Sequence, residues 1–307
     1  MEISGSKVLM LGGWGMVGMA ICRKLLEKKP RTIIISSLTR SQAEEAVKEL
    51  QPLAGNTELI PAWGNIFVRD EFKDLSRSEI LEHPQRRILL AEDILERTTS
   101  TTFEKFFLYR LITHHRPQII IDCVNTATGV AYQDIYTAGL KVLEGVKRAR
   151  KEGVNEEFLD EVEKLLGTLY IPQLVRHVQV IHSAMVDAGV RSYLKVGTSG
   201  TGGMGLNIPY THSEDRPSRV LLSKSSIAGA HTLLLYLMAR TPEGPYVKEV
   251  KPTTAIAWKR ITKDKVWKGG KPVSLYDCPP ERATILEGEI LTYDPQSAVP
   301  LNREMIG

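Results

Sequence analysis

Several glycines stand where a short apolar segment near the start of the chain gives way to an amphipathic one. Residues 8–11 are apolar, and Val17, Ala20, Ile21 and Leu25 follow at helical spacing. A strand, a glycine turn and a helix in this order are typical of a site for the diphosphate of a dinucleotide. The first glycine allows the tight turn, the middle one lets backbone approach the diphosphate, and the last lets the helix pack close to the strand. The N–H groups of the first helical turn would face the anion. The predicted turn comprises Gly12, Gly13, Trp14, Gly15, Met16, Val17 and Gly18.

The second predicted strand ends without an acidic side chain. Residues 32–35 are apolar and β-branched, and no Asp or Glu stands between them and Arg40. An NAD-selective site normally has an acid here for the ribose hydroxyls, whereas a basic residue accommodates the 2′-phosphate of NADP. The pattern therefore favours NADP over NAD, and the alternative is an arginine that is merely solvated. The possible hydrogen-bond donors beside Arg40 are Ser36, Ser37 and Thr39. Ser41 and Glu44 have the spacing of a capping box for the next helix.

The spacing Gly12-x-x-Gly15-x-x-Gly18 resembles that of the extended short-chain dehydrogenase/reductase family, which includes the nucleotide-sugar epimerases and dehydratases. The resemblance implies a doubly wound parallel sheet, with the ligand at the carboxyl ends of the strands. The alternation of strand and helix patterns over residues 7–252 implies the same α/β class, the Rossmann fold.

Two segments are longer than the family pattern requires. We expect residues 1–252 to form an NAD(P)-binding domain with insertions near 69–102 and 129–170, the second carrying a charged helical stretch at 144–164. Residues 253–307 would form a small C-terminal substrate or capping region. Because this region is short for a full substrate domain, the alternative is that the chain is the N-terminal part of a longer architecture.

The third strand has two candidate positions. Residues 57–68 contain Gly64-Asn65-Ile66, which resembles the family's glycine-acid-aliphatic turn beside adenine, with Asn65 in place of the acid. Residues 87–95 end in a similar turn and are the alternative strand. The sequence leaves both positions open.

The fourth strand and the helix after the second insertion follow the family pattern more closely. Residues 119–124 form a continuous apolar run typical of a buried parallel strand. The turn after this run takes the place of the family's small-residue turn, and the resemblance implies that it lines the cofactor cleft; it contains Asn125, Thr126 and Ala127. The helix predicted at 171–188 would pack on the sheet or form an oligomer contact.

The catalytic part of the family pattern is incomplete. After a strand at 193–196, the resemblance places Thr198 where the family holds the substrate's oxygen, with Ser199 as its neighbour. The family's catalytic Tyr-x-x-x-Lys is represented by Lys224, but Val220 stands in place of the tyrosine. By resemblance, Lys224 would contact the nicotinamide ribose, and the alternative is a lysine that is merely solvated. The helix that contains it is predicted to bury one face, formed by Ile227, Ala228, His231 and Leu235.

A different proton donor is therefore needed if the protein is an enzyme. Tyr210, His212 and Tyr132 lie in segments that flank the strand ends, and Tyr210 is the preferred candidate. The resemblance implies an NADP-dependent oxidoreductase or epimerase-like enzyme that acts on a carbonyl or hydroxyl substrate with a non-standard acid. The alternative is a non-catalytic NADP-binding sensor or scaffold. Retained Thr198 and Lys224 favour the enzyme, and the missing tyrosine favours the binder.

The bulk composition is that of a soluble globular protein. The 307 residues are 42% hydrophobic and 25% charged, and the net charge of +4 is too small and too scattered to predict a nucleic-acid partner. Three distant cysteines suit reduced thiols, and no apolar run reaches the ~20 residues of a membrane span, so we expect a cytoplasmic protein. His114 and His115 have no partner spaced for a metal, and no metal site is predicted. The expected partner is a small-molecule substrate, and a homo-oligomer with a second copy of the chain is left open.

Overall fold

The computed structural model describes residues 2–97, 101–126, 129, 135–197 and 219–250, together with short strands beyond residue 265. Contacts divide the chain into two compact units, residues 1–200 with 216–252 and residues 201–215 with 253–307.

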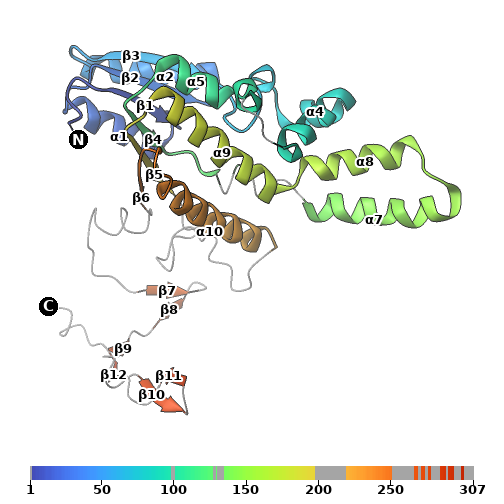
Figure 1. Ribbon diagram of the computed structural model, residues 1–307. Coiled ribbons are helices and arrows are strands. Elements are labelled where there is room, and N and C mark those ends of the chain that lie inside the picture. The colour runs from blue at the N-terminus through green and yellow to red at the C-terminus, as the bar shows by residue number, and fades with distance from the viewer. Residues whose placement is uncertain are drawn as a thin grey trace. The chain divides into compact units, whose positions relative to one another are not determined.

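The first unit is built on a six-stranded sheet in the order β3-β2-β1-β4-β5-β6, and every neighbouring pair is parallel (Figure 1). The order reverses between β1 and β4, which makes the sheet doubly wound and puts the switch point at the carboxyl ends of those two strands. The predicted α/β Rossmann class is thereby confirmed. The strands are β1 (Lys7–Leu11), β2 (Thr32–Ser37), β3 (Glu58–Trp63), β4 (Ile119–Asp122), β5 (Ser192–Val196) and β6 (Tyr246–Val250).

Helices cover both faces of the sheet. Side chains alternate along each strand, so Val8 and Met10 pack against α1 and α2, whereas Leu9 and Leu11 join the cluster that contains α5 and α9. Burial on both faces explains the unbroken apolar runs at residues 33–35 of β2 and 119–121 of β4. The covering helices are α1 (Met16–Leu26), α2 (Arg40–Leu50), α5 (Phe107–His115), α9 (Tyr170–Ala188) and α10 (Arg219–Ala239).

Two local predictions about the first two helices are corrected. Val17 and Ala20 are exposed, and α1 instead buries a face rotated by about one residue, formed by Gly18, Met19, Cys22, Leu25 and Leu26. The capping box of α2 is formed by Thr39 and Gln42 rather than by Ser41 and Glu44, because the helix begins one residue earlier, at Arg40. Thr39 Oγ1 accepts the N–H of Gln42, so this hydroxyl caps the helix.

The two segments predicted to be insertions contact each other. Residues 87–95 lie in α4 (Pro84–Leu95), which follows α3 (Arg77–Glu82), so they are not the third strand. Leu90, Ala91 and Ile94 are buried at helical spacing, which a strand with period two would not allow. The second insertion forms an antiparallel hairpin of α7 (Ile135–Glu152) and α8 (Glu156–Gly167), and α8 contacts α4 (Figure 1). The single charged stretch predicted at 144–164 is therefore two helices, separated at Gly153, whose φ is +89°.

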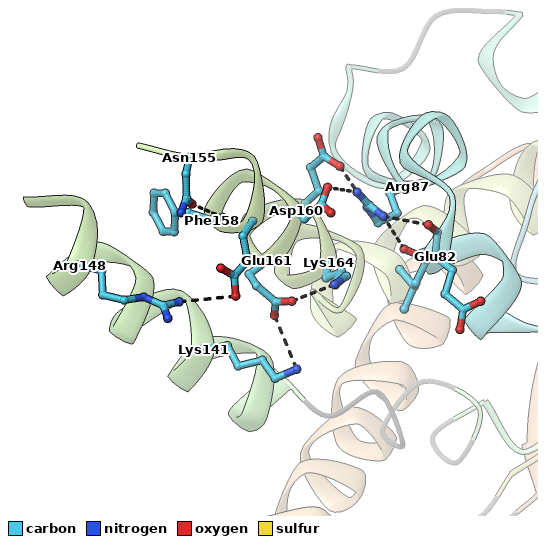
Figure 2. Close-up of polar contacts among 12 residues, drawn as sticks. Glu82, Arg87, Lys141, Arg148, Asn155, Phe158, Asp160, Glu161 and Lys164 are labelled. Carbon is cyan, nitrogen blue, oxygen red and sulfur yellow. Dashed lines mark hydrogen bonds and ion pairs between the residues drawn. The ribbon is translucent and has the colours of Figure 1, made fainter. Parts of the chain in front are cut away.

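Arg87 joins the two insertions. Its side chain is 2% exposed, and its guanidinium pairs with Asp160 and with Glu163 of α8 while it donates to the carbonyls of Leu81 and Glu82 (Figure 2). Further ion pairs on α8 link Glu161 to Lys164 and to Lys141 of α7.

Three short 3-10 turns connect these elements, namely η1 (Gln51–Leu53), η2 (Asp70–Phe72) and η3 (Thr102–Lys105). In the second unit, the described residues form three antiparallel pairs. These are β7 (Val266–Lys268) with β8 (Lys271–Val273), β9 (Tyr276–Asp277) with β12 (Val299–Pro300), and β10 (Thr284–Glu287) with β11 (Ile290–Tyr293). No helix within the described ranges is long and apolar enough to cross a membrane.

Candidate functional site

The glycine turn after β1 is held by close contacts that require glycine. Gly12 has a φ of +74°, and a Cβ on it would lie 3.2 Å from the backbone of Cys123 and Val124. A Cβ on Gly18 would lie 2.2 Å from the carbonyl oxygen of Gly12, so the helix approaches the turn more closely than any side chain permits. The predicted structural roles of these two glycines are confirmed.

Gly15 differs from its neighbours because it has room around it. Its φ is −63°, and a Cβ there would meet only the Gly12 carbonyl, at an ordinary 3.5 Å. Gly15 is the N-cap of α1, and no side chain caps the helix. Neither backbone geometry nor packing within the protein therefore requires glycine at this position, in accord with a glycine kept for the approach of a ligand.

A cavity of about 320 Å³ lies at the carboxyl ends of the central strands. It brings together residues from four separate strand ends, including three that were predicted to face the cofactor: Gly12, Ser36 and Asn65. The lining residues are Gly12, Ser36, Ser37, Leu38, Gly64, Asn65, Ile66, Phe67, Val124 and Gly129. The cavity occupies the switch point of the sheet, where doubly wound folds bind their ligands.

Two predicted polar side chains at this cavity are used to hold backbone. Ser37 Oγ accepts the N–H of Trp14 at 3.2 Å and so ties the glycine turn to β2. Asn65 Oδ1 accepts the N–H of Phe67 at 3.0 Å, which closes the turn after β3. In both cases the short side chain shapes the cavity wall.

Two cationic side chains lie beside an aromatic ring at the end of β3. The guanidinium of Arg40 lies 5.2 Å from the centre of the Trp63 ring, and Lys73 Nζ lies 5.3 Å from the same centre. Arg40 Nε donates to Glu44 at 2.7 Å, and Lys73 pairs with Asp74 at 2.9 Å. Sequence reasoning missed Trp63 and Lys73. The only local signal was the position of Trp63 directly before Gly64.

The turn after β4 rests on a buried ion pair that the sequence did not reveal. Lys195 Nζ lies 2.9 Å from Asp122 Oδ2, and the hydroxyl of Tyr193 donates to the same oxygen at 2.7 Å. Burial opposes ionisation of Asp122, but the adjacent ammonium outweighs it and holds the pKa of the carboxyl below its ordinary value. For Tyr193, burial and the neighbouring carboxylate raise the pKa well above its ordinary value.

Lys224 lies within α10, whose predicted apolar face is confirmed because Ile227, Ala228, His231 and Leu235 are all buried. Lys224 is itself only 6% exposed, and burial lowers the pKa of its ammonium. The lysine predicted as solvated in the alternative interpretation is thus a buried one. Beside it, Ser223 Oγ lies 3.4 Å from the hydroxyl of Tyr136, a tyrosine of α7 that sequence reasoning did not single out.

Several predicted site residues, both catalytic and cofactor-binding, lie outside the described residues. These are Thr198, Ser199 and Tyr210, the alternative donors His212 and Tyr132, and Ala127 of the turn after β4. Asn125 and Thr126 are described, and Thr126 is buried beside Lys195.

The residues capable of redox or metal chemistry carry no site in the described part of the chain. Burial raises the pKa of the Cys22 and Cys123 thiols to about 12, which makes them poor nucleophiles. His114 and His115 stack edge to face at the end of α5, with 4.7 Å between ring centres. No cluster of three metal-ligating side chains occurs among the described residues.

A parallel sheet of this strand order, with a glycine turn after its first strand, defines a Rossmann-type α/β protein. Solved structures with a similar fold include the protein Pen from Bacillus thuringiensis, with 9% identity and a TM-score of 0.42 over 82% of this chain and 50% of that one. A metagenomic short-chain oxidoreductase in complex with NADP has 12% identity and a TM-score of 0.42 over 82% of both chains. UDP-glucose 4-epimerase from Thermotoga maritima has 13% identity and a TM-score of 0.35 over 80% of this chain and 54% of that one.

The chain thus spans about half the length of the Bacillus and Thermotoga proteins. No protein-family model and no curated protein matches the sequence. The expected similarity to short-chain dehydrogenases/reductases is therefore one of fold. Because the TM-scores are below 0.5, the fold class rests on the observed sheet order.

Proposed function

We propose that the protein binds NADP in the cavity at the carboxyl ends of β1 to β4. The observation that carries this proposal is the geometry of the glycine turn. Gly12 and Gly18 are required by backbone and packing, whereas Gly15 stands at the start of α1 with space around it. A diphosphate placed there would face the N–H groups of the first turn of α1, which has no acidic residue.

The cations at the end of β2 and β3 support NADP over NAD. The Nε of Arg40 is engaged with Glu44, so a 2′-phosphate would be bound by the two terminal nitrogens of the guanidinium. Lys73 Nζ, which lies 5.3 Å from the centre of the same Trp63 ring, would supply a second charge. Glu44 would compete with the phosphate for Arg40, and the second cation offsets this competition.

The reaction we propose is hydride transfer between NADP and a carbonyl or hydroxyl group of a small molecule, as in the oxidoreductases and epimerases of the short-chain dehydrogenase/reductase type. Thr198 or Ser199 would hold the substrate's oxygen, and Lys224 the nicotinamide ribose. The C-terminal region, residues 253–307, would cover or select the substrate.

The proton donor in this proposal is Tyr210, and Tyr136 is a second candidate. Val220 cannot donate a proton, and the hydroxyl of Tyr136 lies 3.4 Å from Ser223, the residue next to Lys224. Tyr136 is 42% exposed, so solvent or a ligand can reach it.

A non-catalytic NADP binder is the second candidate function, and the specific observation in its favour is Val220 in place of the family's tyrosine. One experiment separates the two. NADPH binding is measured by fluorescence titration, and NADPH oxidation is then followed with a panel of carbonyl compounds and nucleotide sugars. Binding with turnover that is lost in Tyr210→Phe or Tyr136→Phe supports the enzyme and identifies the donor. Binding without turnover on the panel favours the binder, and absence of binding rejects both.

A further inference from the structure

A buried ion pair that the proposed reaction does not use lies between β4 and β5. Asp122 and Lys195 are opposite each other in the parallel register, and they are 0% and 1% exposed. Burying two charges is unfavourable unless hydrogen bonds satisfy their remaining polar atoms.

Both charges hold the turn that follows β4. Asp122 Oδ1 accepts the N–H of Val124 at 2.9 Å. Lys195 Nζ donates to the carbonyl of the same residue at 2.7 Å and to Thr126 Oγ1 at 3.1 Å. One ion pair thus fixes the peptide groups on both sides of Val124.

The turn held in this way forms part of the cavity wall. Val124 lines the cavity, and its backbone nitrogen lies 3.2 Å from the position that a Cβ on Gly12 would take. A shift of the turn would therefore move the wall of the cavity and the first glycine of the diphosphate turn together.

We propose that the Asp122–Lys195 ion pair is a positioning device that holds the Val124 turn against Gly12, so that the dinucleotide cavity is formed before the ligand arrives. The inference rests on the proposed function. Both side chains are buried and neither lines the cavity, so they are positioning residues. An apolar pair of the same size would fill the space between the strands but could not hold both peptide groups.

The test uses a charge-neutral double variant, Asp122→Asn with Lys195→Met. Asn keeps an acceptor for the Val124 N–H, and Met keeps most of the lysine's volume, but the donors to Val124 and Thr126 are lost. We expect the Kd for NADPH to rise at least about tenfold, because a displaced wall no longer matches the ligand. The matched control is Arg87→Met with Glu163→Gln, which removes a different ion pair, between a buried arginine and a partly exposed carboxylate away from the cavity, and should change the Kd by less than about twofold.

A second measurement tests the positioning role of the Asp122–Lys195 ion pair without any ligand. Amide hydrogen exchange read by mass spectrometry should become faster in peptides that cover residues 122–126 of the double variant and remain unchanged in peptides of α7 and α8. If the double variant does not fold, Thr126→Val removes one of the three turn contacts and should give the same local change at smaller size, with a Kd raised about threefold.

Wild-type affinity in a folded double variant would overturn the inference, and so would faster exchange spread evenly over the chain. If the wild-type protein fails to bind NADPH, the proposed function falls. The exchange measurement then decides the inference alone. Faster exchange confined to residues 122–126 supports the positioning role of the ion pair, and unchanged exchange there rejects it.

Discussion

At the scale of single residues, the glycines of the first turn separate into two kinds. Gly18 has no space for a side chain within the protein itself, whereas Gly15 does. The fold itself therefore requires glycine at position 18, whereas at position 15 only a bound ligand would require it. The presence of glycine at both positions does not by itself reveal this difference.

Gly15→Val should abolish NADPH binding while the protein stays folded. The valine methyl groups would occupy the space that the diphosphate needs, and the φ of −63° suits any residue. The measurement is a fluorescence titration combined with circular dichroism. Gly18→Ala is the control: its Cβ would overlap the Gly12 carbonyl, so we expect a loss of roughly 3 kcal/mol in the free energy of unfolding. Retained NADPH binding in Gly15→Val would place the phosphate site elsewhere.

Arg40→Ala should weaken NADPH binding about tenfold and leave NADH binding within about twofold, because a charge-assisted contact to the 2′-phosphate is lost. Lys73→Ala should have the same selective effect at smaller size. Titration of each variant with both cofactors gives the comparison, and Arg110→Ala, an exposed cation that pairs with Asp70, serves as control. Equal affinities of the wild-type protein for NADPH and NADH would contradict the assignment.

Lys224→Ala should weaken NADPH binding whether or not the protein is an enzyme, since the proposed contact is with the cofactor ribose. Lys224→Met, which keeps the buried aliphatic volume, separates loss of the ammonium from loss of packing. Affinities that match the wild-type value in a folded Lys224→Met variant would remove Lys224 from the site.

At the scale of elements, the two segments predicted to be insertions form one helical module on the parallel-sheet core. α4 contacts both α8 and α9, and Arg87 lies at the junction of α4 with α8. The insertions are far apart in sequence, so this module is decided by long-range packing.

Arg87→Met should lower the free energy of unfolding by roughly 2 kcal/mol and increase hydrogen exchange in α7 and α8. The expected loss in the free energy of unfolding is moderate because Asp160 and Glu163 are partly exposed and can regain water when the arginine is lost. Urea denaturation measures the change. Arg148→Met removes an exposed pair whose atoms are 3.9 Å apart and should change stability by less than about 0.5 kcal/mol. Equal losses of stability in the two variants would contradict the conclusion that Arg87 holds α4 and α8 together.

At the scale of the whole molecule, a buried histidine couples stability to pH. Burial lowers the pKa of His177 from 6.5 to about 4, although Asp122 opposes the shift, so the ring is neutral in the folded protein at pH 7. Between these two values the unfolded chain binds more protons than the folded one. Stability is therefore fully present above pH 6.5 and is lost as the pH falls towards 4.

The expected loss is at most about 3 kcal/mol, measured by urea denaturation at a series of pH values. His177→Phe, which places a second ring beside Phe67, should flatten the profile between pH 6.5 and 4. The depressed pKa of Asp122 adds a separate loss at lower pH, as that carboxylate is protonated. A wild-type profile that is already flat between pH 6.5 and 4 would contradict the assignment to His177.

The sequence by itself determined the features that depend on neighbouring residues. The turn with Gly12 and Gly18, the buried apolar strands and the apolar face of α10 could be predicted, because backbone conformation and side-chain periodicity act within one or two turns of chain. Local patterns did not decide between the two candidate positions of the third strand. The structure decides it, because residues 87–95 lie in α4 with their apolar side chains on one helical face, and the third strand is β3.

Only the tertiary structure decided which distant side chains meet. Lys195 is 73 positions from Asp122 by residue number, and Arg40 and Lys73 meet at Trp63 from separate elements. No local sequence pattern indicates such pairs, because the role of each side chain depends on a partner that is distant in sequence and is placed beside it only by folding. The cavity itself is of the same kind, since it exists only where four strand ends come together.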